Sequence, residues 1–350
     1  MILLLGLREL QWSRRRFAVA VLATALVFAL GLLMSGVSAS FDNEIDRTVD
    51  SFGADAWLVR GESFGPFTGP ATIPVSGARA VRTQPGVDRA DPIAVLRAST
   101  TTPSRRNVNL IGVSPGGVGA PAGWQSRLLA RGGSAVADES LGLAVGDEID
   151  LNGRTLRVGA VTHGQTYFAG IPTVIVSLRD AQVLALDGRP LATAIVTRGQ
   201  PTTVPRGFAA LANDEVARDL ARPVLQAKQT IGLIRMLLWV VAAGIIGAIV
   251  YLSVLERTRD FAALKAIGVS TAHLLGGLVL QAVVLSVLSA LLAVGIEEAI
   301  APAIAMSVEV PLSAYVSLPL VAVLVGVLAS FIGLRRAVGV DPALSFAGSR

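Results

Sequence analysis

The stretch FAVAVLATALVFALGLLMSGV, residues 17–37, contains no charged side chain. A helix of about 20 apolar residues is long enough to cross the roughly 30 Å hydrocarbon core of a bilayer. Three later stretches, residues 236–255, 274–296 and 316–334, have the same apolar character. We therefore predict a membrane α-helical protein with four transmembrane helices, one followed by three.

The composition of the whole chain agrees with a membrane location. Hydrophobic residues make up 52% and charged residues 16%, whereas soluble domains carry about 25% charged residues. The net charge is +5, but the basic residues are dispersed and aromatics reach only 5%, so no nucleic acid partner is expected. Cysteine is absent, and His163 and His273 lack the spacing of metal ligands, so we expect no disulfide, metal or cofactor.

Basic residues flank the predicted spans unevenly. They precede the first span, occupy the 256–273 loop and follow the fourth span: Arg8, Arg14, Arg15, Arg16, Arg257, Arg259, Lys265, Arg335 and Arg336. The short loop 297–315 has neither lysine nor arginine. The positive-inside rule then places both termini and the 256–273 loop in the cytoplasm, and residues 38–230 outside. The expected location is the inner membrane of a bacterial cell.

Two alternatives exist for the N-terminal region. Small residues at 37–39 offer a site for signal-peptide cleavage, but the apolar core of a signal peptide takes roughly 7 to 15 residues, so a membrane anchor is favoured for 17–37. Residues 1–16 are rich in leucine and arginine, which predicts a short cytoplasmic or interfacial helix.

Residues 38–230 read as a mostly β (α+β) extracytoplasmic domain. Short apolar runs bounded by turn residues predict strands at 56–60, 92–99, 108–113, 134–137, 148–151, 155–162, 173–177 and 193–197. Asn152-Gly153 is a two-residue hairpin signal, because both residues tolerate positive φ.

Both ends of this domain are predicted to be helical, which would place it on a helical stalk. Phe41, Ile45 and Val49 recur every four residues after the first span, and Gly53 is a suitable helix stop. Asn213 is a candidate N-cap for a helix that runs into the second span.

The loop between the second and third spans begins ERTRDFAALKAIGV, residues 256–269. Phe261, Leu264 and Ile267 fall on one stripe at three-residue spacing, with Lys265 beside them and Gly268 as a helix stop. This pattern predicts a short amphipathic helix at the cytoplasmic end of the bundle. A charged turn that only anchors two spans fits the periodicity equally well.

The run ERTRDFAALKAIG resembles the loop after the second span in the MacB/FtsX-like family of ABC transporter permeases. The tail 335–350 is similar to that family's closing segment, with Arg335-Arg336-Ala337 followed by Asp341-Pro342-Ala343-Leu344. The order of one span, a large outer domain and three spans is also similar. Ser345-Phe346 stands where leucine-arginine is more usual.

The resemblance implies that the 256–273 loop is a coupling helix seated on a separate ABC ATPase subunit. The residues implied at that interface are Glu256, Arg257, Arg259, Phe261, Leu264, Lys265, Ile267 and Gly268. The family also implies a second permease copy, as a homodimer or with a related chain. ATP would be bound by the partner, because this chain has no Gly-x-x-x-x-Gly-Lys-Ser/Thr loop and its glycine-rich run 112–123 lacks a lysine.

Three functions are compatible with the sequence and the resemblance. The first is a permease that uses a partner's ATP hydrolysis to move the outer domain and to export or extract a substrate. The second is an FtsX-like mechanotransmission subunit that activates an enzyme outside the membrane. The third is a membrane-anchored domain without nucleotide coupling. None requires a catalytic residue in this chain, so it is not expected to be an enzyme.

Overall fold

The computed structural model describes residues 14–61, 63–69, 71–121, 123–256, 267–268, 270–300, 310–318, 320–321, 323–324 and 327–328. The chain divides into two compact units. Met1–Ser40 and Ala227–Arg350 form the first, called here the helical unit. Phe41–Gln226 form the second, called here the β domain.

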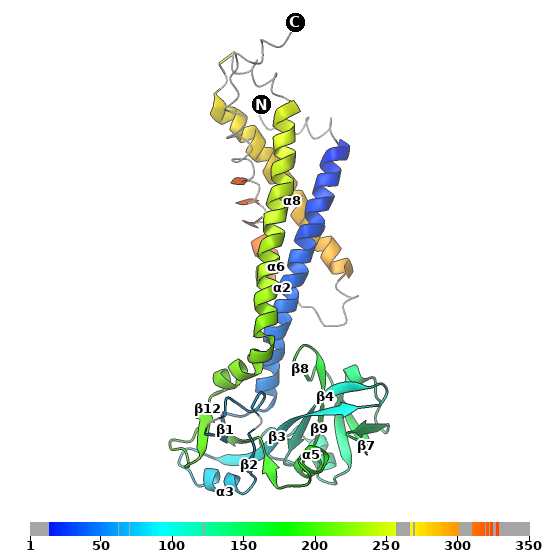
Figure 1. Cartoon of the computed structure of the whole chain (residues 1–350), viewed down its shortest axis with the longest axis vertical. Coiled ribbons are helices and arrows are strands. Elements are labelled where there is room, and N and C mark those ends of the chain that lie inside the picture. Colours follow the sequence, from blue (N-terminus) through cyan, green and yellow to red (C-terminus); the bar gives the residue numbers. More distant parts are fainter. Residues whose placement is uncertain are drawn as a thin grey trace. The chain divides into compact units, whose positions relative to one another are not determined.

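Three long helices dominate the membrane-spanning part of the chain (Figure 1). They are α2 (Arg14–Ser51), α6 (Asn213–Glu256) and α8 (Thr271–Ile300), and each is long and apolar enough to cross a membrane. They contain the first three predicted spans. The fourth predicted span, 316–334, lies mostly outside the described residues, although residues 312–318 are helical. The predicted N-terminal helix, 1–16, also falls almost entirely outside them.

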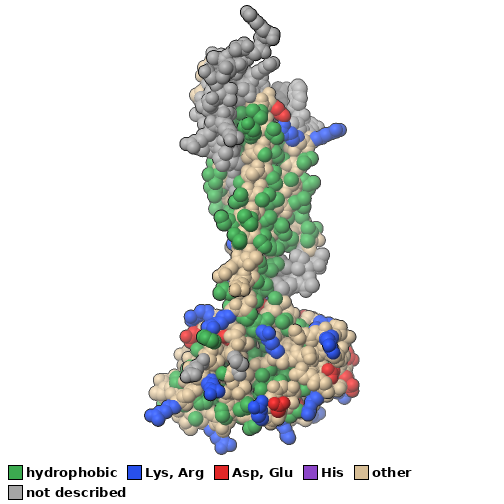
Figure 2. Space-filling view, in the orientation of Figure 1, with side chains coloured by type: hydrophobic (Ala, Val, Ile, Leu, Met, Phe, Trp, Pro, Cys, Tyr) green, Lys and Arg blue, Asp and Glu red, His purple; other side chains and the backbone are tan. Residues whose placement is uncertain are grey.

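Helices α2, α6 and α8 pack through small and branched apolar side chains. Two buried clusters join them: Ala20, Ile246, Val250, Val254, Leu278, Ala282 and Leu285 form one, and Ala25, Phe28, Ala29, Leu32, Ala242, Ala290, Ala293 and Leu318 form the other. Alanine lets helix backbones approach closely, which drives association inside a bilayer. Hydrophobic side chains also cover the visible outer face of the helices, whereas charged side chains gather on the β domain (Figure 2).

The β domain is built on one mixed sheet in the order β12-β1-β11-β3-β4-β9-β5-β7-β6, with β8 paired to β9. The β4–β9 and β5–β7 pairs are parallel and the others are antiparallel. The longer strands are β1 (Ala56–Arg60), β3 (Arg89–Thr100), β4 (Arg106–Val113), β5 (Ser134–Asp138), β6 (Glu148–Leu151), β7 (Arg154–Thr162), β9 (Ile171–Ser177), β11 (Ala194–Arg198) and β12 (Phe208–Leu211). The short strands are β2 (Ile73–Pro74), β8 (Thr166–Tyr167) and β10 (Leu191–Ala192), and β2 pairs with β10.

Short helices cover the sheet. These are α3 (Gly77–Arg82), α4 (Trp124–Leu129), the 3₁₀ turn η1 (Glu139–Leu141) and α5 (Leu178–Ala185). The core of the β domain, in the described residues, includes two clusters of buried apolar side chains. The larger cluster contains Ala94, Leu110, Val158, Val176 and, from α5, Ala181, and the smaller contains Leu58, Ala90, Ile195 and, from α3, Val81.

The predicted strands are present as β1, β3, β4, β5, β6, β7, β9 and β11, each within three residues of the predicted bounds. The predicted hairpin turn is confirmed: β6 and β7 pair antiparallel with Leu151 opposite Arg154. In the turn between these two strands, Asn152 has φ of 51° and Gly153 has φ of 81°. The short strands, β12 and the short helices were not predicted.

The α2 and α6 segments that lie in the β domain are helical as predicted, but the predicted N-cap of α6 is wrong. Phe41, Ile45 and Val49 are buried, and Gly53 ends the α2 segment with φ of 54°. Asn213 is not an N-cap, because its amide carbonyl accepts from the Trp57 indole N–H and its amide nitrogen donates to Ala54. Glu215 instead accepts the N–H of Ala212 at the start of α6.

Candidate functional site

The predicted coupling segment is only partly described. Glu256 is the last residue of α6, Ile267 is 80% exposed, and Gly268 has φ of 96° in a turn. The other predicted interface residues, Arg257, Arg259, Phe261, Leu264 and Lys265, lie outside the described residues. Their role at an ATPase interface therefore stays a prediction.

Glu256 has a partner that the sequence did not indicate. Its carboxylate forms an ion pair with Arg16 of α2, and Arg16 also donates to the Ile249 carbonyl oxygen at 3.4 Å. The sequence predicts Arg16 as a positive-inside signal and as part of a short cytoplasmic or interfacial helix, not as an ion-pair partner. The two side chains are 33% and 63% exposed, so the pair contributes at most about 1 kcal/mol. Its effect is to tie the end of α6 to the start of α2.

Within the β domain, α2 holds one loop through a carboxylate. Glu44 accepts hydrogen bonds from the Thr166 hydroxyl at 2.8 Å, the Ala169 N–H at 3.1 Å and the Gly170 N–H at 2.9 Å. Thr48, one turn later on α2, donates to the Thr166 carbonyl oxygen at 3.4 Å. This set of contacts, the Glu44 clamp, fixes the loop around β8 to the end of α2.

Helix α6 holds a second loop in the same way. Asp219 is 1% exposed, and its carboxylate accepts from the Phe67 N–H at 3.0 Å, the Thr68 N–H at 3.2 Å and the Thr68 hydroxyl. A Cβ added at Gly65 would overlap this carboxyl group, so the close approach requires glycine there. These contacts form the Asp219 clamp. No sequence pattern indicates either clamp, because acidic side chains on a helix are usually solvated.

An aromatic cluster connects the two clamped loops. Phe52 meets Trp57 with ring centroids 4.9 Å apart, Trp57 meets Phe67 at 5.8 Å, and Phe67 meets Tyr167 edge-on at 5.4 Å. Such pairs add about 0.5–1.5 kcal/mol each beyond their burial. Phe52 follows α2 and the Trp57 indole binds Asn213 at the start of α6, so the cluster also joins the two helix ends.

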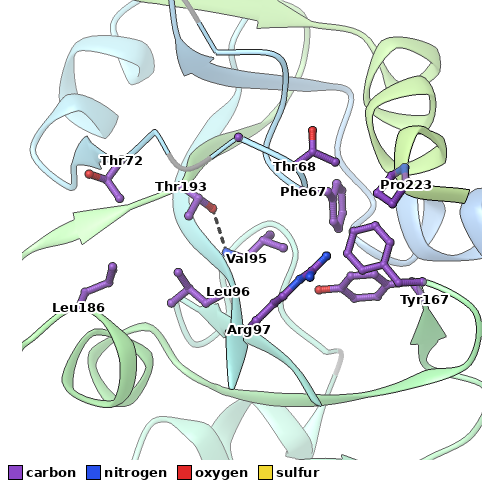
Figure 3. Close-up of a pocket in the computed structure, with 12 residues that line it drawn as sticks. Phe67, Thr68, Thr72, Val95, Leu96, Arg97, Tyr167, Leu186, Thr193 and Pro223 are labelled. Atoms are coloured by element: carbon purple, nitrogen blue, oxygen red, sulfur yellow. Dashed lines mark hydrogen bonds between the residues drawn. The ribbon is translucent and has the colours of Figure 1, made fainter. Parts of the chain in front are cut away.

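A cavity of about 510 Å³ opens beside this cluster (Figure 3). Both clamped loops line it, through Phe67, Thr68, Tyr167 and Phe168, and α6 contributes Pro223. The other walls come from β3 and from the segment before β11. Figure 3 shows Arg97 reaching toward the aromatic side chains, while Leu186 and Thr72 lie toward the other end.

The electrostatics of this cavity depend on Arg97 and Tyr167. The Arg97 guanidinium lies 4.9 Å from the centroid of the Phe168 ring, a cation–π contact. Burial raises the pKa of the Tyr167 hydroxyl far above its usual value, and the nearby Arg97 opposes this only in part. Tyr167 is therefore neutral at physiological pH, and Arg97 is the charged group of the cavity wall.

The glycine-rich run 112–123 has a structural use within the β domain. The buried carboxylate of Asp91 accepts the Val118 N–H at 2.9 Å and pairs with Arg82 and Arg89. The N–H of Gly117 is bonded to the Ser114 carbonyl oxygen. These backbone groups are thus engaged inside the fold rather than turned toward a phosphate.

The described part of the chain combines three helices that are long and apolar enough to cross a membrane with a folded α+β domain, the architecture of a membrane protein. Comparison with protein families agrees with this class. A model of the FtsX-like permease C-terminal region matches residues 232–342, and a model of the MacB-like periplasmic core domain matches residues 18–227.

Curated relatives match along almost the whole chain. An ABC transporter permease of Mycobacterium bovis and one of Mycobacterium tuberculosis are each 40% identical over 347 residues, covering 98% of this chain and 99% of theirs. A second Mycobacterium tuberculosis permease is 37% identical with the same coverage. The chain belongs to the ABC transporter permeases of the MacB/FtsX-like family.

Solved structures give weaker similarity. The periplasmic region of MacB from Actinobacillus actinomycetemcomitans has a TM-score of 0.36 and 13% identity, covering 50% of this chain and 97% of that one. The extracellular domain of the ABC-type transporter YknZ from Gram-positive bacteria has a TM-score of 0.32 and 11% identity, covering 42% of this chain and 83% of that one.

Proposed function

We propose that this permease couples ATP hydrolysis in a separate ATPase subunit to movement of the β domain, and that this movement exports or extracts a substrate. The observation that carries the proposal is the pair of clamps. Helices α2 and α6 each contain a predicted span and a segment of the β domain, and each holds a different loop through a carboxylate, Glu44 or Asp219.

The connections between the helices and the clamped loops are stiff. A continuous helix transmits displacement along its axis, and hydrogen bonds to a charged group contribute about 1.5–3 kcal/mol each. A shift of α2 relative to α6 would therefore move the loop around Ala169 relative to the loop around Phe67. The cavity between these loops would change shape in response.

In this proposal, the 256–273 loop contacts the ATPase subunit. We place both termini and this loop in the cytoplasm, with the β domain outside the inner membrane and ATP bound only by the partner. The apolar stripe Phe261, Leu264 and Ile267 would seat on the ATPase, and the Arg16–Glu256 pair would keep the adjoining ends of α2 and α6 together.

A second permease copy completes the proposed assembly, because four spans are few for enclosing a substrate path. Apolar side chains such as Val240 and Val241 on α6 are exposed in the single chain and suit contact with lipid or with that copy. Cysteine cross-linking from α2 or α6 should trap dimers in native membranes. Recovery of monomer alone would argue against the assembly.

The clamps can be tested by hydrogen–deuterium exchange on the permease purified with its ATPase. Trapping with ATP and vanadate should change amide exchange in segments 65–69 and 166–170. Glu44→Ala should remove mainly the change in 166–170, and Asp219→Ala mainly the change in 65–69. Asp46→Ala, an exposed acid on α2, is the matched control and should keep both. A wild-type complex in which nucleotide alters neither loop would contradict the proposal.

The FtsX-like alternative, activation of an enzyme outside the membrane, would use the same helix movement. The match of residues 232–342 to the FtsX-like permease C-terminal region supports this alternative. The two functions differ in what stimulates ATP turnover: small molecules for a transporter, or a protein partner for a mechanotransmission subunit. An anchored domain without nucleotide coupling would show neither response.

A further inference from the structure

The cavity beside the aromatic cluster has the make-up of a small-molecule site. Its volume of about 510 Å³ lies within the roughly 300–1,000 Å³ typical of ligand pockets. Its walls combine aromatic rings, aliphatic side chains such as Leu96 and Leu186, and the hydroxyls of Thr68 and Thr72. Ligand pockets commonly pair such an apolar lining with a few polar groups that orient the ligand.

The charge on the described lining of the cavity is positive. Arg97 lines the cavity, and no acidic side chain does so among the described residues. The contact recorded for its guanidinium is with the Phe168 ring, and within the described chain no carboxylate lies at ion-pairing distance from it. The donors of an arginine fork are therefore available to an anionic group that enters the cavity.

The walls are preformed. Phe168 and Ala169 have φ of 57° and 65°, left-handed values that bulky residues rarely adopt. The Glu44 clamp holds this segment by accepting the Ala169 and Gly170 N–H groups. The Asp219 clamp holds the opposite wall at Phe67 and Thr68. A ligand would thus meet an ordered site and would lose little affinity to ordering the loops.

We infer that this cavity binds an amphipathic monoanion, whose anionic group pairs with Arg97 and whose flat apolar body packs against Phe67, Tyr167 and Leu96. This inference deepens the proposed function by naming the substrate class of the permease. The identification of the ligand as the substrate rests on the proposed function, whereas binding of the ligand does not. Because both clamped loops line the cavity, the bound ligand would contact the loops that α2 and α6 would move under the proposed function. The neutral Tyr167 hydroxyl would not repel the anion.

The test uses the full-length permease in lipid nanodiscs and isothermal titration calorimetry, with empty nanodiscs subtracted. The probes are 2-naphthoate and its uncharged isostere 2-naphthamide. Arg97→Gln removes the charge of an exposed side chain, and Arg154→Gln, an exposed arginine at the start of β7, is the matched control. Thr72→Trp fills the cavity and serves as an independent second variant. Elution as a single species in size-exclusion chromatography checks the folding of each variant.

Wild type and Arg154→Gln should bind 2-naphthoate saturably and more tightly than 2-naphthamide. Arg97→Gln should weaken 2-naphthoate about 10- to 100-fold, the effect of losing a charge-assisted hydrogen bond, and should abolish the preference for the acid. Thr72→Trp should weaken both probes.

The inference is overturned by absent binding of 2-naphthoate to wild type, by equal affinity for the two probes, or by unchanged affinity in Arg97→Gln or Thr72→Trp. Binding requires no ATPase, so the outcome is separable from the test of coupling. If wild type does not bind 2-naphthoate but nucleotide still changes hydrogen–deuterium exchange in the two loops, only the inference about the cavity is overturned. If wild type binds 2-naphthoate but nucleotide changes exchange in neither loop, only the proposed function is overturned.

Discussion

At the scale of single residues, the β domain depends on helix carboxylates that join distant parts of the chain, one of them the buried Asp219. Asp219 reaches Phe67 and Thr68, and Glu44 reaches Thr166, over separations of more than a hundred residues. Local sequence patterns carry no information about such pairs, and the same limit applies to Arg16 and Glu256. For Asn213 the local pattern predicted an N-cap, but its side-chain oxygen instead accepts a hydrogen bond from the distant Trp57 indole.

The Asp219 clamp predicts a specific loss of stability. Asp219→Ala would leave the buried N–H of Phe67 without an acceptor, at about 1–3 kcal/mol, and would also remove the partly buried hydrogen bond from the Thr68 N–H. We expect the β domain to lose at least about 2 kcal/mol, measured as a lower Tm by tryptophan fluorescence of the full-length protein. Asp46→Ala should leave Tm nearly unchanged. Equal Tm values for the two variants would rule out an energetic role for the clamp.

At the scale of elements, the sequence predicted what periodicity and turn chemistry determine. Uncharged runs identified α2, α6 and α8, short apolar runs bounded by turn residues identified most of the longer strands, and Asn152-Gly153 identified the hairpin. The two-residue strands β2, β8 and β10 were missed because they have no period of their own and exist only through pairing. Helix α5 was missed although the sequence contains a signal for its start, because Ser177 is the N-cap and Asp180 stands three residues later.

The β6–β7 hairpin gives a prediction at this scale. Gly153 has φ of 81°, a conformation that costs a residue with a side chain about 1–2 kcal/mol. Gly153→Val should therefore lower the thermal stability of the β domain. Arg154→Val, which introduces the same side chain at the exposed first residue of β7, should be tolerated because valine suits strands. Comparable Tm values for the two variants would show that the turn does not require glycine.

At the scale of the whole molecule, the distribution of arginine predicts the orientation in the membrane. A single cysteine at Val145, which is 64% exposed on the β domain, should react with a membrane-impermeant thiol reagent in intact cells. A cysteine at Ala263, in the 256–273 loop, should react only after permeabilisation. The chain has no native cysteine, so the background is low. The reversed labelling pattern would invert the proposed topology.

Coupling to an ATPase is the central proposal, and the 256–273 loop, predicted from its apolar stripe and from the family resemblance, is the part of the chain that would contact the ATPase. Apolar anchors at the centre of an interface cost about 1–4 kcal/mol or more when disrupted, whereas charges at the rim cost less and act mainly on association rate. Leu264 belongs to the predicted apolar stripe, and Lys265 lies beside it.

The most direct measurement is co-purification of the ATPase subunit with the Leu264→Asp and Lys265→Ala variants, at membrane levels matched to wild type. We predict that Leu264→Asp loses most of the ATPase while Lys265→Ala retains nearly all of it. Full retention by Leu264→Asp at a normal membrane level would contradict the coupling-helix assignment, and with it the proposed function.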